Sequence, residues 1–347
     1  MDESVLDGCI PRIIEWYREN RRDLPWRRSP TPYGVWISET MLQQTRIEAV
    51  IGYYQRFMAE LPDVASLAAA EDDRLMKLWQ GLGYYSRARN LKRAAAAIME
   101  RFGGELPRTE EELRSLPGIG AYTAGAVASI AFGLPVPAVD DNVLRVLSRL
   151  LALEEDIMLT KTRTEAAGLL RQRYPSGEAS ALLTEGLMEL GETVCLPGGA
   201  PLCPSCPVAE LCRAHRAGEE ARYPVRGARK ARRVEERTVL LLKSGDRVAI
   251  RRRPATGLLA GLWEFPNVPG TLTEAEARAW AESLGGTVTS VATAGRTKHV
   301  FTHVEWHMTG YFVELAAETG DLVWRTPEEI DEDYSIPTAL RFYVKML

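Results

Sequence analysis

The chain has 347 residues, 46% of them hydrophobic, and a formal net charge of −4. This length exceeds that of a typical single hydrophobic core and predicts two domains. No apolar run is long enough to span a bilayer, and the acidic start of the chain differs from a basic signal peptide, so we expect a cytoplasmic protein with no membrane partner. The small net charge neither favours nor excludes nucleic acid, because a basic groove can lie on an acidic protein.

The first two-thirds of the chain has the apolar periodicity of helices and few alternating β patterns. Trp26 and Arg27 follow the first predicted helix. A tryptophan beside an arginine is suited to hold a flat heterocycle by stacking and hydrogen bonding. Anchoring of the loop to the core by Trp26 explains the pair equally well, because tryptophan is usually buried.

Glu39 lies in a predicted helix and shares a face of it with Gln43. Its neighbours are apolar: Trp36, Ile37, Met41 and Leu42. Desolvation by such neighbours favours the protonated carboxyl that a general acid needs near neutral pH. Capping of the helix start near Ser38 is the simpler interpretation of an isolated glutamate, but the motifs below favour the general acid.

The segment GLGYYSRARN at residues 81–90 places Leu82 and Tyr84 on a predicted turn, with Arg87 and Arg89 just after it. An apolar or aromatic tip followed by basic residues is suited to enter a base stack while the arginines approach phosphates. A turn between helices whose tyrosines pack inward fits the segment as well.

Residues 116–149 predict a glycine hairpin, a helix of small residues, a proline-rich crossing and then Asp140 at the start of another helix. Gly118 and Gly120 let the backbone turn tightly and point amide hydrogens outward at a helix N-terminus. Such a nest of amides suits a phosphate. An ordinary turn between helices is the alternative for so short a motif.

Four of the five cysteines form the pattern C-x7-C-x2-C-x5-C: Cys195, Cys203, Cys206 and Cys212. In a protein expected to be cytoplasmic we interpret them as metal ligands rather than disulfides. Four soft thiolates at short spacings can wrap one compact metal centre, and a structural zinc is one possible occupant. Cys9 is left over and is expected to be a small buried side chain.

The last third of the chain has the pattern of strands after an arginine-rich predicted linker at residues 222–236. We predict a hairpin of residues 238–243 and 247–252, a helix at 274–284, strands at 287–291, 299–307 and 309–315, and a closing helix near Thr338. The motifs RRRP at 251–254 and GLWEFP at 261–266 are similar to the core of Nudix hydrolases. The paired glutamates that hold magnesium in those enzymes do not follow Gly270, so nucleotide hydrolysis is not expected.

Together, SETMLQQT around Glu39, GLGYYSR, LPGIGAYTAG and VDDNV around Asp140 resemble the motifs of adenine DNA glycosylases of the MutY type. The resemblance runs from about Leu24 to the end of the chain. It implies an all-α helix-hairpin-helix glycosylase domain with a 4Fe-4S cluster over residues 1–221, the linker, and an α+β Nudix-like lesion-recognition domain over residues 237–347. The first cysteine gap is one residue longer than the family's, which costs little closure entropy.

The resemblance also implies roles for the matched residues. Glu39 would protonate adenine at N7 and Asp140 would stabilise the cationic sugar, a division of labour that glycoside cleavage generally needs. Tyr122 and Asn142 would lie near the sugar. Because Tyr122 stands where lyases of the endonuclease III type have a lysine, no Schiff-base nucleophile is expected.

Three further groups of residues match the family by position. Those of the adenine pocket are Trp26, Arg27 and Glu185. Those that contact DNA are Gln43, Gln44, Thr45, Leu82, Tyr84, Gly118 and Gly120. Those that read oxidised guanine are Phe301, Thr302 and His303, although alternation alone would make this triplet part of a strand with Phe301 inward.

Three residues depart from the family pattern. Asp141 stands where glycine is usual and is expected to cap the following helix. Thr184, beside Glu185, replaces a common asparagine and weakens the pocket assignment. Thr302 replaces a serine, which keeps the hydroxyl but adds a methyl group.

The expected function is excision of adenine mispaired with 8-oxoguanine or guanine in double-stranded DNA, by monofunctional hydrolysis and as a monomer. A glycosylase of the same superfamily that acts on thymine or an oxidised pyrimidine is one alternative. A protein that binds the lesion without cutting is the other, and Asp141 beside the site makes it conceivable.

Overall fold

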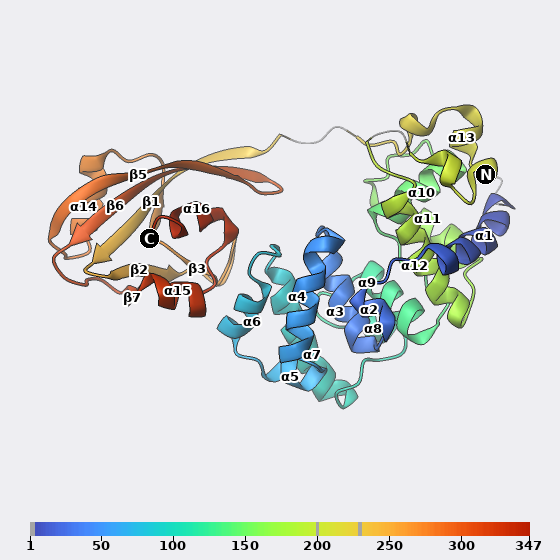
Figure 1. Ribbon diagram of the computed structural model, residues 1–347, viewed down its shortest axis with the longest axis horizontal. Helices are drawn as coiled ribbons and strands as arrows, with labels where there is room; N and C mark the ends of the chain where they lie inside the picture. Colours follow the sequence, from blue (N-terminus) through green and yellow to red (C-terminus); the bar gives the residue numbers. More distant parts are fainter. Residues whose placement is uncertain (1–3, 199–200, 228–230) are drawn as a thin grey trace. The chain divides into compact units, whose positions relative to one another are not determined.

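The computed structural model describes residues 4–198, 201–227 and 231–347, and the chain forms two compact units. The first unit comprises Met1–Ala69 and Arg89–Ala228, and the second comprises Ala70–Ala88 and Arg229–Leu347 (Figure 1). None of the helices in the described ranges is long and apolar enough to cross a membrane.

The first unit is helical, as the periodicity predicts (Figure 1). Its α-helices are α1 (Ser4–Asn20), α2 (Pro25–Arg28), α3 (Pro32–Leu42), α4 (Ile47–Glu60), α5 (Val64–Ala69), most of α7 (Ser86–Phe102), α8 (Glu110–Arg114), α9 (Ala121–Ala126), α10 (Asp141–Leu151), α11 (Thr160–Arg171), α12 (Glu178–Thr193) and α13 (Arg213–Ala217). The segment Val127–Ala131 continues α9 as a π-helix, a form that is frequent at functional sites. Helices α1, α10, α12 and α13 share one buried core.

Two close approaches of backbone fix the elements that carry the predicted site. Helix α1 packs on α12 at Gly186, where a Cβ atom would lie 3.1 Å from Ile13 and from Tyr17. The hairpin helix α9 packs on the proline-rich crossing at Gly125, where a Cβ atom would lie 2.3 Å from the carbonyl oxygen of Pro137. Only glycine allows the second contact, so the crossing that leads to Asp140 lies directly against the hairpin helix.

The second unit contains a seven-stranded sheet with helices on both faces (Figure 1). Its strands are β1 (Arg233–Ser244), β2 (Arg247–Arg252), β3 (Trp263–Glu264), β4 (Asn267–Pro269), β5 (Val288–Val300), β6 (Val304–Leu315) and β7 (Val323–Arg325). They follow the order β3-β2-β1-β6-β5, with β4 paired to β1, β7 paired to β2, and β1 parallel to β6. Helix α14 (Glu274–Glu282) packs on one apolar face, and α15 (Pro327–Asp333) and α16 (Arg341–Val344) cover the other.

The predicted first hairpin is confirmed, and the predicted strands 287–291 and 309–315 are found within β5 and β6. The prediction of one continuous strand over 299–307 is wrong. Strands β1 and β2 pair around the predicted turn, but β1 begins at Arg233, inside the predicted linker, because its first residues pair with β6. Residues 228–230 of that linker lie outside the described residues. The predicted strand 299–307 is instead a hairpin between β5 and β6, closed by a hydrogen bond from the Phe301 amide to the Val304 carbonyl of 2.8 Å. The alternating pattern continues through this turn, so alternation alone hides it.

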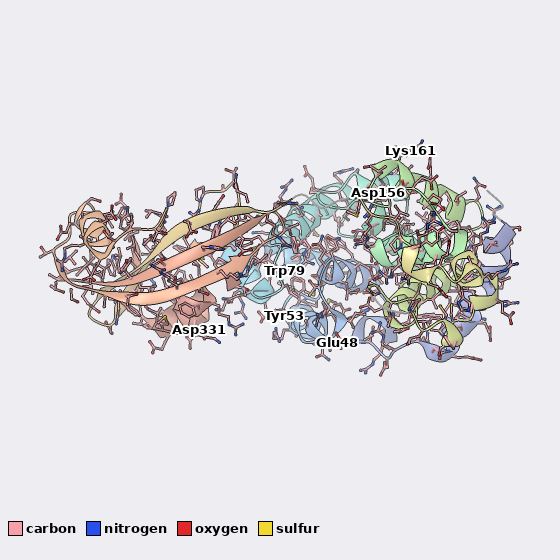
Figure 2. All side chains as sticks on the ribbon, turned by 90° about the horizontal axis from the view of Figure 1, so that it is seen from above. Glu48, Tyr53, Trp79, Asp156, Lys161 and Asp331 are labelled. Atoms are coloured by element: carbon pink, nitrogen blue, oxygen red, sulfur yellow. The ribbon has the colours of Figure 1, made fainter. Side chains whose placement is uncertain are left out.

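Residues 70–88 pack with the second unit through helix α6 (Asp72–Trp79). The Ser335 hydroxyl donates to the Met76 carbonyl at 3.0 Å, and the Trp263 indole donates to the Asp73 carboxylate at 3.2 Å. Lys77 of α6 donates to the carbonyl of Asp331 in α15 (Asp331 is labelled in Figure 2). The turn after α6 therefore belongs to the same compact unit as the β5–β6 hairpin.

Candidate active site

One cavity of about 770 Å³ in the first unit gathers most of the predicted site residues. Helices α2 and α3, the glycine hairpin, the start of α10 and one face of α12 line it. The predicted residues found there are Trp26, Arg27, Glu39, Gln43, Gln44, Thr45, Gly118, Gly120, Tyr122, Asp140, Asn142 and Glu185. Segments far apart in sequence thus meet at one site.

Glu39 is buried near the end of α3, where it is 5% exposed. The Tyr122 hydroxyl donates to its Oε2 atom at 2.5 Å. Burial raises the pKa of Glu39 from 4.5 to about 7, and the hydrogen bond from Tyr122 opposes this rise only in part. The alternative role as a helix cap is excluded, because Thr31 caps α3 two turns earlier by accepting from the Gly34 amide at 3.0 Å.

Asp140 is the N-cap of α10, and its Oδ1 atom accepts from the Val143 amide at 2.7 Å. Burial raises the pKa of Asp140, while hydrogen bonds from the helix amides and the charge of Arg145 favour its anion. A carboxylate at a helix N-terminus is also stabilised by the helix dipole. Asp140 is therefore fixed in position and provided with partners that support a negative charge.

The predicted cap at Asp141 is wrong. Asp141 is the first residue inside α10, and its exposed carboxylate pairs with Arg163 at 2.7 Å. The residue before it already accepts the free helix amide, so no capping position remains for Asp141. The next side chain, Asn142, donates to Glu192 at 3.1 Å and accepts from Arg145 at 2.9 Å.

Trp26 is buried and Arg27 is partly buried on α2, and both line the cavity. The Trp26 ring packs edge-on against Tyr54, with ring centroids 5.5 Å apart, so it anchors the loop and also borders the site. Glu185 lies 3.4 Å from Arg27, and burial raises its pKa. The Thr184 side chain points away from the cavity, because its hydroxyl lies 2.7 Å from the hydroxyls of Tyr174 and Ser129. The threonine that replaces the family's usual asparagine therefore does not line the cavity.

Arg22 and Glu189 are among the charged residues of this cavity that sequence reasoning missed. Glu189 follows Glu185 by one helical turn on α12, a spacing that places both on one face. That spacing was the available signal. The sequence contained nothing to show that Arg22 and Arg27, more than 160 positions away, would pair with it.

The rim of the cavity carries the predicted DNA contacts of the first unit. Gln43 ends α3 and donates to the Thr123 hydroxyl at 3.1 Å. Gln44 is exposed in a left-handed conformation with φ of 58°. Gly118 turns the hairpin with φ of 75°, and Gly120 is the N-cap of α9.

In the second unit, Tyr84 is 46% exposed but Leu82 is buried, so Tyr84 is the outward tip of the 80–85 turn. The Tyr84 and Thr302 hydroxyls are 2.8 Å apart. The expected approach of Arg87 to phosphates is wrong, because Arg87 is buried and donates to the carbonyls of Leu82 and Gly83. Its guanidinium instead holds the turn in shape.

The hairpin residues Phe301 and His303 differ in exposure. Phe301 packs edge-on against Trp306 and His299, with ring centroids 5.0 and 4.6 Å away, so it stiffens the hairpin. His303 is exposed. Thr302, between them, carries the only hydroxyl of the triplet and presents it toward Tyr84.

The four cysteines line one cavity beneath α10 and α12: Cys195, Cys203, Cys206 and Cys212. Burial raises the pKa of Cys206 to about 12 and that of Cys203 to about 11. Clustered thiolates at such a site need a bound cationic centre to offset burial, so the donor set fits a metal cofactor. The Arg149 guanidinium donates to the Cys195 sulfur at 3.2 Å, which also supports a negative sulfur.

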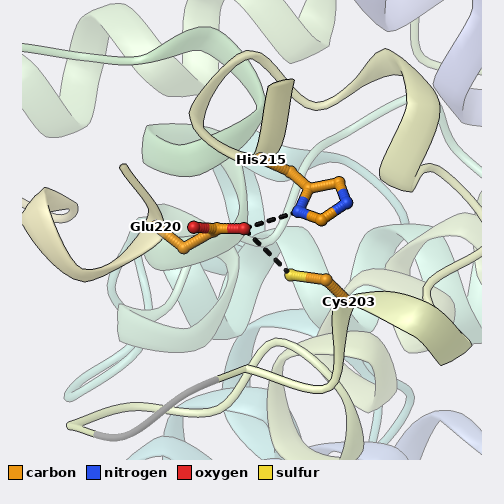
Figure 3. A group of neighbouring side chains, drawn as sticks. All are labelled: Cys203, His215 and Glu220. Atoms are coloured by element: carbon orange, nitrogen blue, oxygen red, sulfur yellow. Dashed lines mark hydrogen bonds and ion pairs between the residues drawn. The ribbon is translucent and has the colours of Figure 1, made fainter. Parts of the chain in front are cut away.

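Two polar residues and a fifth cysteine lie beside these four cysteines. Glu220 contacts the Cys203 sulfur at 3.7 Å and the His215 ring at 2.5 Å (Figure 3). Cys9 is fully buried near the group, as expected for a residue that packs in the core.

Comparisons with known proteins agree with this arrangement. Residues 37–172 match the HhH-GPD superfamily of base excision DNA repair proteins, and residues 237–346 match the NUDIX domain. A solved thermostable thymine-DNA glycosylase is 27% identical, with a TM-score of 0.56, over 62% of this chain and 98% of its own. A solved endonuclease III–DNA complex is 25% identical, with a TM-score of 0.53, over 63% of this chain and 98% of its own. The fold and the site thus define a helix-hairpin-helix DNA glycosylase that carries a Nudix-like domain.

A human relative narrows the class. The adenine DNA glycosylase of Homo sapiens is 34% identical over 98% of this chain and 74% of its own length. The chain belongs to the adenine DNA glycosylase family. The family resemblance and the fold class predicted from the motifs are confirmed.

Proposed function

We propose that this protein, as a monomer, excises adenine opposite 8-oxoguanine or guanine in double-stranded DNA by hydrolysis of the N-glycosidic bond. One observation carries the proposal: the buried carboxyl of Glu39, with its pKa raised to about 7, lies in the same cavity as the helix-capping carboxylate of Asp140. The names of the relative and of the DNA-bound neighbour support an adenine base and a DNA substrate.

The two carboxyl groups suit opposite tasks in glycoside cleavage. Adenine is a poor leaving group when it departs as an anion. Protonation at N7 lets it depart as a neutral base, which weakens the glycosidic bond. Tyr122 donates to Oε2 of Glu39 and leaves Oε1 to carry the transferable proton. As the bond breaks, positive charge develops on the sugar, and a fixed carboxylate at Asp140 stabilises it. We assign orientation of the attacking water to Asn142, which hydrogen-bonds to Glu192 and Arg145.

Hydrolysis without strand cleavage is favoured over lyase chemistry. Lyase chemistry by Schiff base needs an amine nucleophile. No lysine occurs among the described residues that line the cavity. Tyr122 stands at the hairpin position where lyases of the endonuclease III type have their lysine. Burial raises the pKa of Tyr122 well above its usual value, so it stays a neutral hydrogen-bond donor.

We assign recognition of the partner base to the second unit, where Tyr84 and Thr302 contact each other. The partner base is guanine or 8-oxoguanine. These two bases differ at N7, which accepts a hydrogen bond in guanine and donates one in 8-oxoguanine. A threonine hydroxyl can serve either base because it both donates and accepts. Gln43, Gln44, Thr45 and the hairpin glycines then contact the DNA beside the site, with amides suited to phosphate oxygens.

The proposed function is tested by single-turnover cleavage of duplexes containing adenine opposite 8-oxoguanine, adenine opposite guanine, or thymine opposite guanine. We expect strand breaks only after alkali and only at adenine, because base removal leaves an alkali-labile site. Breaks at thymine would favour the alternative of a thymine glycosylase, and breaks without alkali would show lyase chemistry. Tight binding without any base release would favour a lesion-binding protein.

We further propose that the four cysteines bind a 4Fe-4S cluster, which holds residues 201–212 against α10 and α12. Cys206→Ser is expected to abolish the visible absorbance of the purified protein and its bound iron and sulfide, because one thiolate ligand is lost. The matched control Cys9→Ala, which changes a buried cysteine outside the motif, should retain both. Stoichiometric zinc without sulfide in the unmodified protein would contradict the cluster.

A further inference from the structure

A buried ion network lies beside the proposed adenine pocket and has no role in the chemistry described so far. At its centre is Glu189 of α12, whose side chain is 1% exposed. Arg22 holds both of its oxygens: Nε lies 2.6 Å from Oε1, and Nη2 lies 3.0 Å from Oε2. The Arg22 amide also donates to Oε1, at 3.2 Å.

Arg27 is the second cation on the same carboxylate. Its Nη2 atom donates to Oε2 of Glu189 at 2.9 Å, and its Nη1 atom donates to the Arg22 carbonyl at 3.4 Å. Its guanidinium lies over the Tyr17 ring, 5.3 Å from the centroid. The far end of Arg27 is therefore fixed by Glu189, Arg22 and Tyr17 together.

The Nε atom of Arg27, unlike its Nη atoms, is not held by a hydrogen bond to any of the described residues. It is buried, with the Glu185 carboxylate 3.4 Å away. A buried donor that makes no hydrogen bond carries an energetic cost that a ligand acceptor can relieve. Arg27 thus offers one unused N–H group in the cavity, with an acceptor, Glu185, beside it.

The pKa values of the two glutamates of α12, Glu189 and Glu185, shift in opposite directions. Burial alone would raise the pKa of Glu189, but the hydrogen bonds and charges of Arg22 and Arg27 outweigh it and hold that pKa below its usual value. For Glu185, burial dominates and raises the pKa. Glu189 is thus the fixed counter-ion of the arginine pair.

We propose that Glu189 is a positioning residue that anchors Arg27 and thereby frees Glu185 and the Arg27 Nε–H group to bind adenine. The inference rests on the proposed function. Adenine presents an exocyclic amine, which a carboxylate accepts, near ring nitrogens that accept from an N–H donor. Thymine presents carbonyl oxygens in place of that amine and would face the carboxylate unfavourably.

The experiment compares the wild type, Glu189→Gln, Arg27→Met and the double variant E189Q/R27M. We expect E189Q to lower the single-turnover rate at saturating enzyme on the order of 10–100-fold, the scale of a misplaced binding group. Affinity for a duplex whose deoxyadenosine carries a 2′-fluorine, which resists cleavage, should change less than about threefold, because backbone contacts dominate binding. The added substitution in E189Q/R27M should change the R27M rate by less than about twofold, since Glu189 acts through Arg27.

Two further variants keep the test decisive. Glu178→Gln removes an equal charge from the exposed first turn of α12 and should match the wild type. If E189Q does not fold, E189Q/R22Q removes one cation together with the anion and should fold but remain slow.

The inference is overturned if E189Q keeps the wild-type rate, or if it slows R27M as much as it slows the wild type, the sign of a general structural role. A wild-type protein that releases no adenine is a different result, since it refutes the proposed function, and the inference falls with it.

Discussion

Replacing Glu39 with glutamine is expected to lower the single-turnover rate of adenine release by about 10²–10⁴-fold, the contribution of a positioned general acid. Glutamine has nearly the same shape, and its carbonyl can still accept from Tyr122, but it has no proton to transfer. The measurement is adenine release from a duplex with adenine opposite 8-oxoguanine at saturating enzyme. Glu100→Gln, which neutralises an exposed glutamate of α7, is the matched control and should retain the wild-type rate.

The pH dependence gives the same experiment a second measurement. Because the pKa of Glu39 is about 7 and the protonated form is the acid, the wild-type rate should fall about tenfold per pH unit above neutrality. The residual rate of the E39Q variant should not show this fall above neutral pH. A wild-type rate that is flat across this range would contradict the assignment of Glu39 as the acid.

Loss of activity in this variant should not come from unfolding. The folded-state pKa of Glu39 is raised from 4.5 to about 7, so the stability linked to its protonated form is complete below pH 4.5 and is lost as the pH rises through 7. Glutamine does not ionise. The E39Q variant should therefore melt at a higher temperature than the wild type at about pH 8, and the difference should shrink toward about pH 4.

The parts of the site that were predicted correctly are those with a local signal. Gly118 and Gly120 mark a turn before a helix, and Asp140 follows a proline-rich crossing and precedes an apolar helical pattern. Capping and turn chemistry depend on a few consecutive residues, so sequence is sufficient to locate them. The wrong assignment of the cap to Asp141 is an error of one position, the usual uncertainty of a helix boundary.

The parts that were missed depend on contacts between distant segments. The Arg22–Glu189 pair spans 167 positions and the contact of Tyr84 with Thr302 spans 218. Neither has a local pattern. Packing of residues 70–88 with the second unit is of the same kind, because it arises from hydrogen bonds to Ser335 and Trp263. Family motifs identified the individual residues of the site, but only the fold shows which side chains hold them.

Replacing Asp140 with asparagine is expected to lower the rate of adenine release by about 10³-fold, because a neutral amide cannot offset the charge that develops on the sugar. The substitution should leave the fold intact. Asparagine is as good an N-cap as aspartate, so its side-chain oxygen can still accept from the Val143 amide. The measurement is again the single-turnover rate, together with the melting temperature.

Asp141→Asn is the matched control, since it removes the same charge one position further along the same helix. The Asp141 carboxylate is exposed and pairs with Arg163 at the surface, where solvent and salt screen its charge, so the rate should stay within about threefold of the wild type. Equal losses in both variants would mean that the negative charge acts from a distance on the whole cavity. A large loss in D140N alone would locate the stabilising charge at the carboxylate that caps α10.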